Sequence, residues 1–136
     1  MSSLKFFKKK CYAVIAFAPT KMSMNDADVA FNEFIADKSK GLVLFHDHFL
    51  GRIGALAIFF IEHQKQLDSL QDDRPIKGWE LQIFPLTFTE LPIEFLYQTD
   101  FTLGVYRGKR LSDLYSEYAG SKYSKNVDEQ LKPIND

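Results

Sequence analysis

Disulfide chemistry, a strong net charge and membrane-length apolar runs are all missing from this sequence. Cys11 is the only cysteine in 136 residues, so no intramolecular disulfide can form and a reducing compartment is the simpler expectation. Lys and Arg number 17 against 18 Asp and Glu, and the net charge of -1 leaves no broad basic surface for nucleic acid or anionic membranes. The apolar run at residues 53–61 is far shorter than the roughly 20 residues that span a bilayer. We therefore expect a cytoplasmic globular protein with no nucleic-acid partner and no membrane partner.

Apolar residues, in contrast, are plentiful. They make up 46% of the chain, and the 13 Phe supply ample material for one hydrophobic core. We expect a single α+β domain at residues 11–118, with a core at 11–88 and an extension at 89–118. Residues 1–10 are expected to form a flexible basic N-terminus, and residues 121–136 a mobile tail with almost nothing to bury.

The N-terminal region has two interpretations. Lysines at positions 5 and 8–10 precede an apolar run at 11–19 that contains Ala-Phe-Ala before its final Pro19, a pattern that resembles a secretory signal. The same run is β-rich and apolar on both faces, as is typical of a buried strand. We favour the strand because the run is short, contains no Leu and would place Pro19 just after the cleavage point.

Four strands and two helices are predicted between residues 12 and 84. The strands are expected at 12–17, 42–49, 55–61 and 79–84. A first helix is expected between N-capping side chains at residues 23–28 and Gly41, and a second helix at 62–71. Apolar residues at the three-and-four spacing of one helical face support the first helix; they are Ala27, Ala30, Phe31, Phe34 and Ile35.

The element order is therefore β-α-β-β-α-β. Right-handed crossovers fold this order into a ferredoxin-like α+β domain, with a four-stranded antiparallel sheet covered by both helices on one face. The other face then has no partner within a single chain, which predicts a contact surface. Alternation along residues 42–49 puts His46 and His48 on the face of Leu44 and leaves Phe45 on the opposite one.

The chain continues beyond this minimal fold. Residues 91–97 fit a short helix or arm, and residues 101–106 alternate well enough for a fifth strand. Ser112 fits the N-cap of a last helix.

Two segments resemble a known superfamily. Residues 54–63, Gly-Ala-Leu-Ala-Ile-Phe-Phe-Ile-Glu-His, and residues 78–85, Gly-Trp-Glu-Leu-Gln-Ile-Phe-Pro, are similar to the third and last core strands of dimeric α/β-barrel proteins. That superfamily includes muconolactone isomerase-like, antibiotic-biosynthesis monooxygenase-like and YCII-related proteins. The resemblance implies a homodimer whose bare sheet faces pack together, with pockets for small molecules inside the barrel or between sheet and helices. The extension after residue 86 departs from the minimal family pattern.

All three histidines fall within one strand–strand–helix segment. His46 and His48 could address one substrate proton, so we predict both as catalytic residues, His46 as acid or base and His48 as its orienting partner. A metal site would need further convergent ligands, for example His63, and no metal or cofactor is predicted. The alternative is that both histidines are incidental strand-end residues.

Three further residues are predicted substrate contacts. Arg52 can bind a carboxylate in bidentate fashion, and Glu80 and Gln82 would line the barrel interior. The alternative for Arg52 is that it is a solvated arginine in a turn, and the alternative for Glu80 and Gln82 is that they form a polar rim. Cys11 follows three lysines, which could lower the pKa of its thiol, but a small hydrophobe at the start of a buried strand is the favoured interpretation.

Aromatic residues of the extension could wall a ligand cavity, although core or interface packing is the simpler explanation; they are Tyr97, Phe101, Tyr106, Tyr115 and Tyr118. RNA-recognition domains share the element order, but Ala55 and Ala57 stand where stacking rings would be needed. The loop at 51–54 looks like a KH-domain GXXG motif, yet it joins two strands rather than two helices.

Two functional hypotheses follow from the sequence. The leading one is a homodimer that binds a small, largely apolar organic molecule and performs cofactor-free isomerase-like or monooxygenase-like chemistry with histidine acid/base groups. The competing one is a non-catalytic interaction or ligand-sensing module whose C-terminal arm contacts a partner.

Overall fold

The structure is a computed structural model and describes residues 4–6 and 8–118. Its chain divides into two compact units, Met1–Phe95 and Leu96–Asp136. The first unit contains, in chain order, β1 (Lys10–Phe17), α1 (Met24–Ala36), the short 3-10 helix η1 (Lys38–Lys40), β2 (Leu42–His48), β3 (Gly54–Ile61), α2 (Gln64–Leu70), β4 (Glu80–Pro85) and the first turn of α3 (Pro92–Arg107). The second unit contains the rest of α3 and α4 (Leu111–Tyr118).

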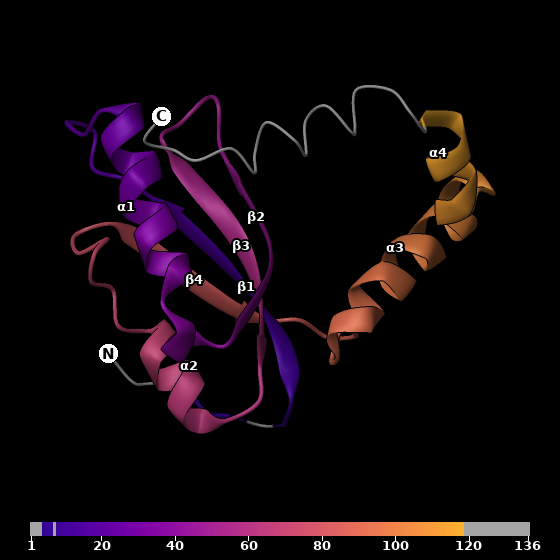
Figure 1. The fold of residues 1–136 in the computed structure, drawn as a ribbon, viewed down its shortest axis with the longest axis horizontal. Helices are drawn as coiled ribbons and strands as arrows, with labels where there is room; N and C mark the ends of the chain where they lie inside the picture. The colour runs from indigo at the N-terminus through magenta and orange to yellow at the C-terminus, as the bar shows by residue number, and fades with distance from the viewer. Residues whose placement is uncertain (1–3, 7, 119–136) are drawn as a thin grey trace. The chain divides into compact units, whose positions relative to one another are not determined.

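The strands described in the first unit form one antiparallel sheet in the order β2-β3-β1-β4 (Figure 1). The expected α+β class with a four-stranded antiparallel sheet is confirmed, and the arrangement is consistent with a ferredoxin-like fold. Residues 10–17 form an interior strand of this sheet, as the strand interpretation of the N-terminal run predicts. No helix in the described part of the chain has both the length and the apolar character needed to cross a membrane.

α1 begins where the sequence predicts its cap. Ser23 Oγ accepts a hydrogen bond from the N–H of Asp26 at 3.1 Å, which satisfies one free donor of the first turn. The buried face of the helix contains four of the five predicted residues; they are Ala27, Phe31, Phe34 and Ile35.

Gly41 occupies a backbone position that other residues tolerate poorly. Its φ is +92°, and a Cβ built there would lie 2.6 Å from the Phe60 carbonyl oxygen. Because α1 ends at Ala36, Gly41 caps the short helix η1 rather than α1 itself.

The main hydrophobic core lies between the sheet and the two helices α1 and α2, which cover the same face (Figure 1). Its largest fully buried apolar side chains come from strands, helices and the loop before β4; they are Tyr12, Val14, Phe31, Phe34, Phe59, Ile61, Leu67, Leu70 and Ile76. Each such side chain stabilises the fold by about 1.5–3 kcal/mol relative to an exposed one. Leu4 and Phe6, ahead of β1, also pack against this core.

β2 does not alternate as its sequence suggests. A bulge lies between Val43 and Phe45, so two residues of β2 occupy the place of one. Leu44 packs into the apolar cluster on the face opposite the helices, whereas Val43 packs into the core beneath them. The prediction that Leu44 shares a face with His46 and His48 is therefore wrong, because one extra residue reverses a period-two pattern.

The sheet face opposite α1 and α2, here called the open face, is partly covered by its own chain. Cys11, Ile58 and Phe60 are buried there, with Leu86 and Phe95 packed against them. The backbone holds this cover in place, since the N–H of Cys11 donates to the Thr89 carbonyl at 3.0 Å and the N–H of Leu86 to the Cys11 carbonyl at 2.9 Å. The expectation that the face has no cover within one chain is wrong around Cys11.

Other parts of the open face are accessible. Leu42, Phe45 and Phe84 each have roughly half of their surface exposed. Phe45 also stacks on Phe95, with 6.4 Å between ring centroids. The exposed apolar area thus lies on the edge strands β2 and β4 rather than across the whole face.

Residues 101–106 belong to α3, and the predicted fifth strand is wrong. Pro92 is the first residue of α3, and Glu94 Oε1 accepts the N–H of Leu91 at 2.7 Å. Gly108, with a φ of +63°, follows its last turn. A short alternation of apolar residues does not distinguish a strand from a helix that is apolar on several sides, and this ambiguity explains the error.

α4 is the expected last helix, but Ser112 is not its cap. The helix begins at Leu111, whose N–H donates to Asp100 Oδ1 at 2.7 Å. Asp100 Oδ2 also accepts Arg110 Nε at 2.8 Å, so this one carboxylate of α3 holds the start of α4. The predicted tail at 121–136 lies outside the described residues.

Removal of the Phe95 ring should expose Cys11 to thiol reagents. Cys11 has 0% of its surface exposed, so the native protein should react slowly, and Phe95→Ala should react faster because part of the cover is lost. The measurement is the rate of thiol labelling under native conditions, with unfolding followed in parallel. Phe101→Ala is the control, because Phe101 belongs to the same helix but not to the cluster around Cys11. Equal labelling rates for wild type and Phe95→Ala would contradict this account of the open face.

Candidate functional site

The two strand histidines lie on the helix-covered face of the sheet. His46 is paired with Ala57 and His48 with Ala55, and both alanines are buried in the core beneath α1 and α2. Residues directly opposite each other in an antiparallel pair point to the same face. The imidazole rings meet edge to face, with 5.6 Å between their centroids. The prediction that these two side chains share a face is correct.

His48 is held against α1. Its Nδ1 lies 3.1 Å from Asp28 Oδ1, and its ring packs edge-on against Phe31 with 5.9 Å between centroids. Nδ1 of His48 is buried and makes no hydrogen bond of good geometry, although the Asp28 carboxylate lies beside it.

His46 is exposed and carries a shifted pKa. Partial removal of the ring from water lowers the pKa of His46, the neighbouring His48 lowers it further, and Asp47 opposes both effects. His46 is consequently neutral over a wider pH range than a free histidine and can accept a proton. An oriented His48 beside a neutral His46 has the parts of an acid/base pair, located at the β2 edge of the sheet.

His63 does not join the other two histidines. It is the N-cap residue of α2, where its N–H and that of Glu62 donate to Gln66 Oε1 at 3.2 and 2.7 Å. It lies six residues beyond Ala57, the partner of His46, a separation on the order of 20 Å along an extended chain. Across residues 4–6 and 8–118, no group of three or more His, Cys, Asp or Glu side chains is arranged to hold a metal ion.

Glu80 and Gln82 face the other way. Glu80 is paired with Phe17 and Gln82 with Ile15, and both alternate along β4 with Leu81, which packs against the core. The side chains of Glu80 and Gln82 therefore point to the open face, as predicted.

Arg52 binds Glu80 across the end of the sheet. Its Nη2 lies 3.2 Å from Glu80 Oε1, and its guanidinium stands 3.9 Å from the centroid of the Phe17 ring. Both charged side chains are more than half exposed, so the ion pair contributes only about 0–1 kcal/mol of stability. The Arg52 guanidinium is already engaged by a carboxylate and a ring.

The sheet separates the two sets of predicted site residues. His46 and His48 lie on the helix-covered face at the β2 edge, whereas Glu80 and Gln82 lie on the open face at the β4 edge. Strands β3 and β1 stand between them. One protomer therefore cannot present both sets to a single small substrate. A catalytic role for His46 and His48 and a substrate-binding role for Glu80 and Gln82 stay predictions, each for its own face of the sheet.

Cys11 is a buried hydrophobe rather than an activated thiol. Burial raises the pKa of Cys11 to about 11, Glu94 adds to the rise, and Lys10 only partly opposes it. Little thiolate exists near neutral pH at such a pKa. The interpretation of a lysine-activated cysteine is wrong, because desolvation outweighs the neighbouring positive charge.

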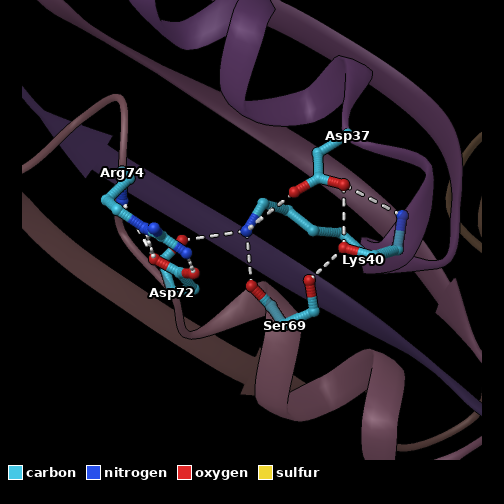
Figure 2. A network of polar contacts seen from close by, with 6 residues as sticks. Asp37, Lys40, Ser69, Asp72 and Arg74 are labelled. Atoms are coloured by element: carbon cyan, nitrogen blue, oxygen red, sulfur yellow. Dashed lines mark hydrogen bonds and ion pairs between the residues drawn. The ribbon is translucent and has the colours of Figure 1, made fainter.

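Lys40 is a buried cation that sequence reasoning missed. Only 1% of its side chain is exposed, and its ammonium donates to the backbone carbonyls of Ser69 and Asp72, the latter at 2.8 Å (Figure 2). Asp37 Oδ2 lies 3.7 Å from the same nitrogen, and the Phe34 ring centroid lies 4.6 Å away. Burial lowers the pKa of Lys40, while Asp37 and Asp72 oppose that shift.

This cluster ties η1 to the end of α2. The last carbonyls of a helix have no partner within it, and Lys40 supplies donors to two carbonyls at and just beyond the end of α2. Figure 2 shows Asp37 and Asp72 on either side of the ammonium, and Arg74 binds the Asp72 carboxylate in turn. Because the ammonium already has its partners, Lys40 is a structural group and not a free nucleophile.

The second unit lacks a core in its described part. No described residue of α3 or α4 is buried, although both helices contain large apolar side chains. The five predicted aromatic residues are each 61% to 71% exposed, at Tyr97, Phe101, Tyr106, Tyr115 and Tyr118. They do not wall a closed cavity within their own unit, so the cavity interpretation is not supported by their burial.

Comparison with protein-family models, curated proteins and solved structures finds no match to this chain.

Replacement of Lys40 by Met should destabilise the first unit. The variant keeps an apolar stem beside Phe34 but leaves the Ser69 and Asp72 carbonyls without their donor. The free energy of unfolding, measured by urea denaturation, should therefore fall by about 1–3 kcal/mol. Lys38→Met in the same short helix is the matched control, because Lys38 is exposed and its loss should change stability by no more than about 0.5 kcal/mol. Equal stability of the two variants would show that water replaces Lys40 at no cost.

The pKa of His46 should respond oppositely to its two neighbours. His48→Asn removes a like charge and should raise the pKa of His46, whereas Asp47→Asn removes an opposite charge and should lower it; imidazole NMR titration measures both. Since the folded pKa is the lower one, the unfolded chain binds more protons between the two values. The contribution of His46 to stability is therefore fully present above its unfolded pKa and decreases as the pH falls through that window. Shifts of the same sign in both variants would refute this assignment.

Proposed function

We propose that this chain is a non-catalytic interaction module that binds a protein partner through α3 and α4. One observation carries the proposal: large apolar side chains populate both helices, and none of the described residues of either helix is buried. Many large exposed apolar side chains in so short a segment are typical of interaction sites. The proposal corresponds to the C-terminal arm predicted to contact a partner.

The length of α3 supports this function. α3 has 16 residues, and helices of roughly this length are only marginally stable in water without tertiary packing. Apolar side chains occur on several sides of α3, a pattern normally found in helices that are covered all round. A binding partner would supply the cover that the described part of the second unit does not.

The positions of the titratable residues also favour binding over catalysis. Arg52 and Glu80 lie on the opposite side of the sheet from His46 and His48, so the acid/base pair lacks the substrate contacts predicted for it. Cys11 and Lys40, the other groups with chemical potential, are buried in structural positions. An interaction module needs none of these groups.

A dimeric α/β barrel is the second candidate, favoured by the exposure of Leu42, Phe45 and Phe84 on the open face. In that arrangement two open faces pack together around a small, largely apolar molecule, without a cofactor. Glu80 and Gln82 would then face the barrel interior, whereas His46 and His48 would not. An isomerase-like or monooxygenase-like reaction would have to use the histidines from outside the barrel.

Site-specific cross-linking tests the proposed function. Benzoylphenylalanine replaces Phe101 in the full chain within its native cells, and the control places it at Leu50, which is 91% exposed in the loop between β2 and β3. Irradiation should give a discrete cross-linked product from position 101 and none from position 50. The product should also disappear when Tyr97→Glu places a charge one turn away on the same side of α3. No product at position 101, or equal products at both positions, would overturn the proposal.

A further inference from the structure

His46 and His48 form a histidine pair at the β2 edge of the sheet. They stand two residues apart on one strand, and both side chains lie on the helix-covered face. His46 is exposed and His48 has 25% of its side chain exposed, so an ion in solution can reach both rings. The pair belongs entirely to the first unit, so its chemistry is independent of the proposed interaction through α3 and α4.

The spacing of the two rings suits one shared metal ion. A histidine nitrogen binds Zn²⁺ at about 2.0–2.1 Å, so two imidazoles on one tetrahedral ion have ring centroids roughly 5–5.5 Å apart. The centroids of His46 and His48 lie 5.6 Å apart, and the ring planes are inclined by 89°. Because His46 is exposed, its ring can rotate toward a common ion without displacing the core.

Asp28 and Phe31 give His48 the orientation that a metal ligand needs. Nδ1 of His48 is buried 3.1 Å from Asp28 Oδ1, and the ring packs edge-on against Phe31. A carboxylate beside one ring nitrogen favours the tautomer with its proton on that nitrogen, which leaves the lone pair on the other one. His48 is therefore prepared to bind an ion through Nε2, with Asp28 as the outer carboxylate that metal-binding histidines usually have.

Asn32 supplies an unsatisfied acceptor on the same side of α1. It follows Asp28 by one helical turn, and its Oδ1 is buried without a hydrogen-bond partner. α1 and β2 run in opposite directions, because only residues 37–41 join them and Asp28 meets the far end of β2. One turn of α1 rises about 6 Å and two residues of β2 span about 6.6 Å, so Asn32 lies level with His46. A water bound to an ion at the histidine pair would supply the donor that this oxygen lacks.

The ligand types decide the class of ion and the strength of binding. Imidazole suits borderline divalent transition ions such as Zn²⁺, whereas Mg²⁺ and Ca²⁺ prefer oxygen ligands. Within the described part of the chain no group of three His, Cys, Asp or Glu side chains forms a metal cage, so water must fill the remaining positions. We propose that His46 and His48 together bind one divalent transition ion of the Zn²⁺ class in an open, exchangeable site, with Asp28 positioning His48. Two protein ligands instead of four imply a Kd on the order of 1–100 µM.

Calorimetric titration of the full chain, without an affinity tag, tests the inference with Zn²⁺ as the probe. The wild type should bind one Zn²⁺ per chain, and Mg²⁺ should not bind. His46→Asn and His48→Asn should each weaken Zn²⁺ binding at least tenfold, because one imidazole alone remains. Asp28→Asn should weaken it about tenfold through the orientation of His48. His63→Asn is the matched control, since it removes the third histidine, keeps a good N-cap residue for α2 and should bind Zn²⁺ as the wild type does.

A second measurement needs no substitution. Paramagnetic Ni²⁺, added below one equivalent, should broaden the imidazole NMR signals of His46 and His48 and leave those of His63 sharp. Thermal unfolding of each variant without metal shows whether it is folded. Added Zn²⁺ should raise the Tm of the wild type and of His63→Asn but not that of His46→Asn.

Three results would overturn the inference. The first is a wild type that binds no Zn²⁺ at about 1 mM, tenfold above the expected range of Kd. The second is a folded His46→Asn or His48→Asn that binds Zn²⁺ as tightly as the wild type. The third is an equal loss of binding in His63→Asn, or Ni²⁺ broadening of His63 alone, since either would place the ion at α2 instead of β2.

Discussion

Two helices can cover only one face of a four-stranded sheet, and this constraint governs the rest of the molecule. α1 and α2 cover one face of the sheet, and the largest buried side chains pack between that face and the helices. The opposite face needs another cover to be shielded from water. Leu86 and Phe95 cover Cys11 on that face, whereas Phe45 and Phe84 on the edge strands stay about half exposed. Residues 86–95 are therefore part of the packing of the first unit.

The same sheet divides the chemistry of the protein. Side chains of successive strand residues leave opposite faces, so a bulge or a single register step decides which groups meet. His46 and His48 stay with the helices, while Glu80 points to the other side. Contacts also decide the role of Lys40. A buried cation with a lowered pKa resembles a functional group, but the Lys40 ammonium is held by two backbone carbonyls and is structural.

The described part of the second unit pairs its charged side chains and leaves its aromatic side chains exposed, whereas small proteins normally bury aromatic rings. Its ion pairs are formed within the chain, as at Asp100 and Arg110, whereas its aromatic rings are left exposed. Polar contacts of this kind orient α4 on α3 but supply little stability in water. Burial of apolar surface is the dominant favourable term in most protein association. The exposed aromatic side chains of this unit are therefore the groups best suited to bind a partner.

Periodicity and capping signals determined the elements of the first unit from sequence alone. Ser23 caps α1, Phe31 and Phe34 face the core, and the strands occur within about two residues of their expected positions, because these features depend on near neighbours in the chain. Only the tertiary structure decided the bulge at Leu44, the helical state of residues 101–106, the pKa of Cys11 and the partners of Lys40. Each of these depends on groups distant in the sequence, or on packing that overrides a weak local preference, and no local pattern encodes such contacts.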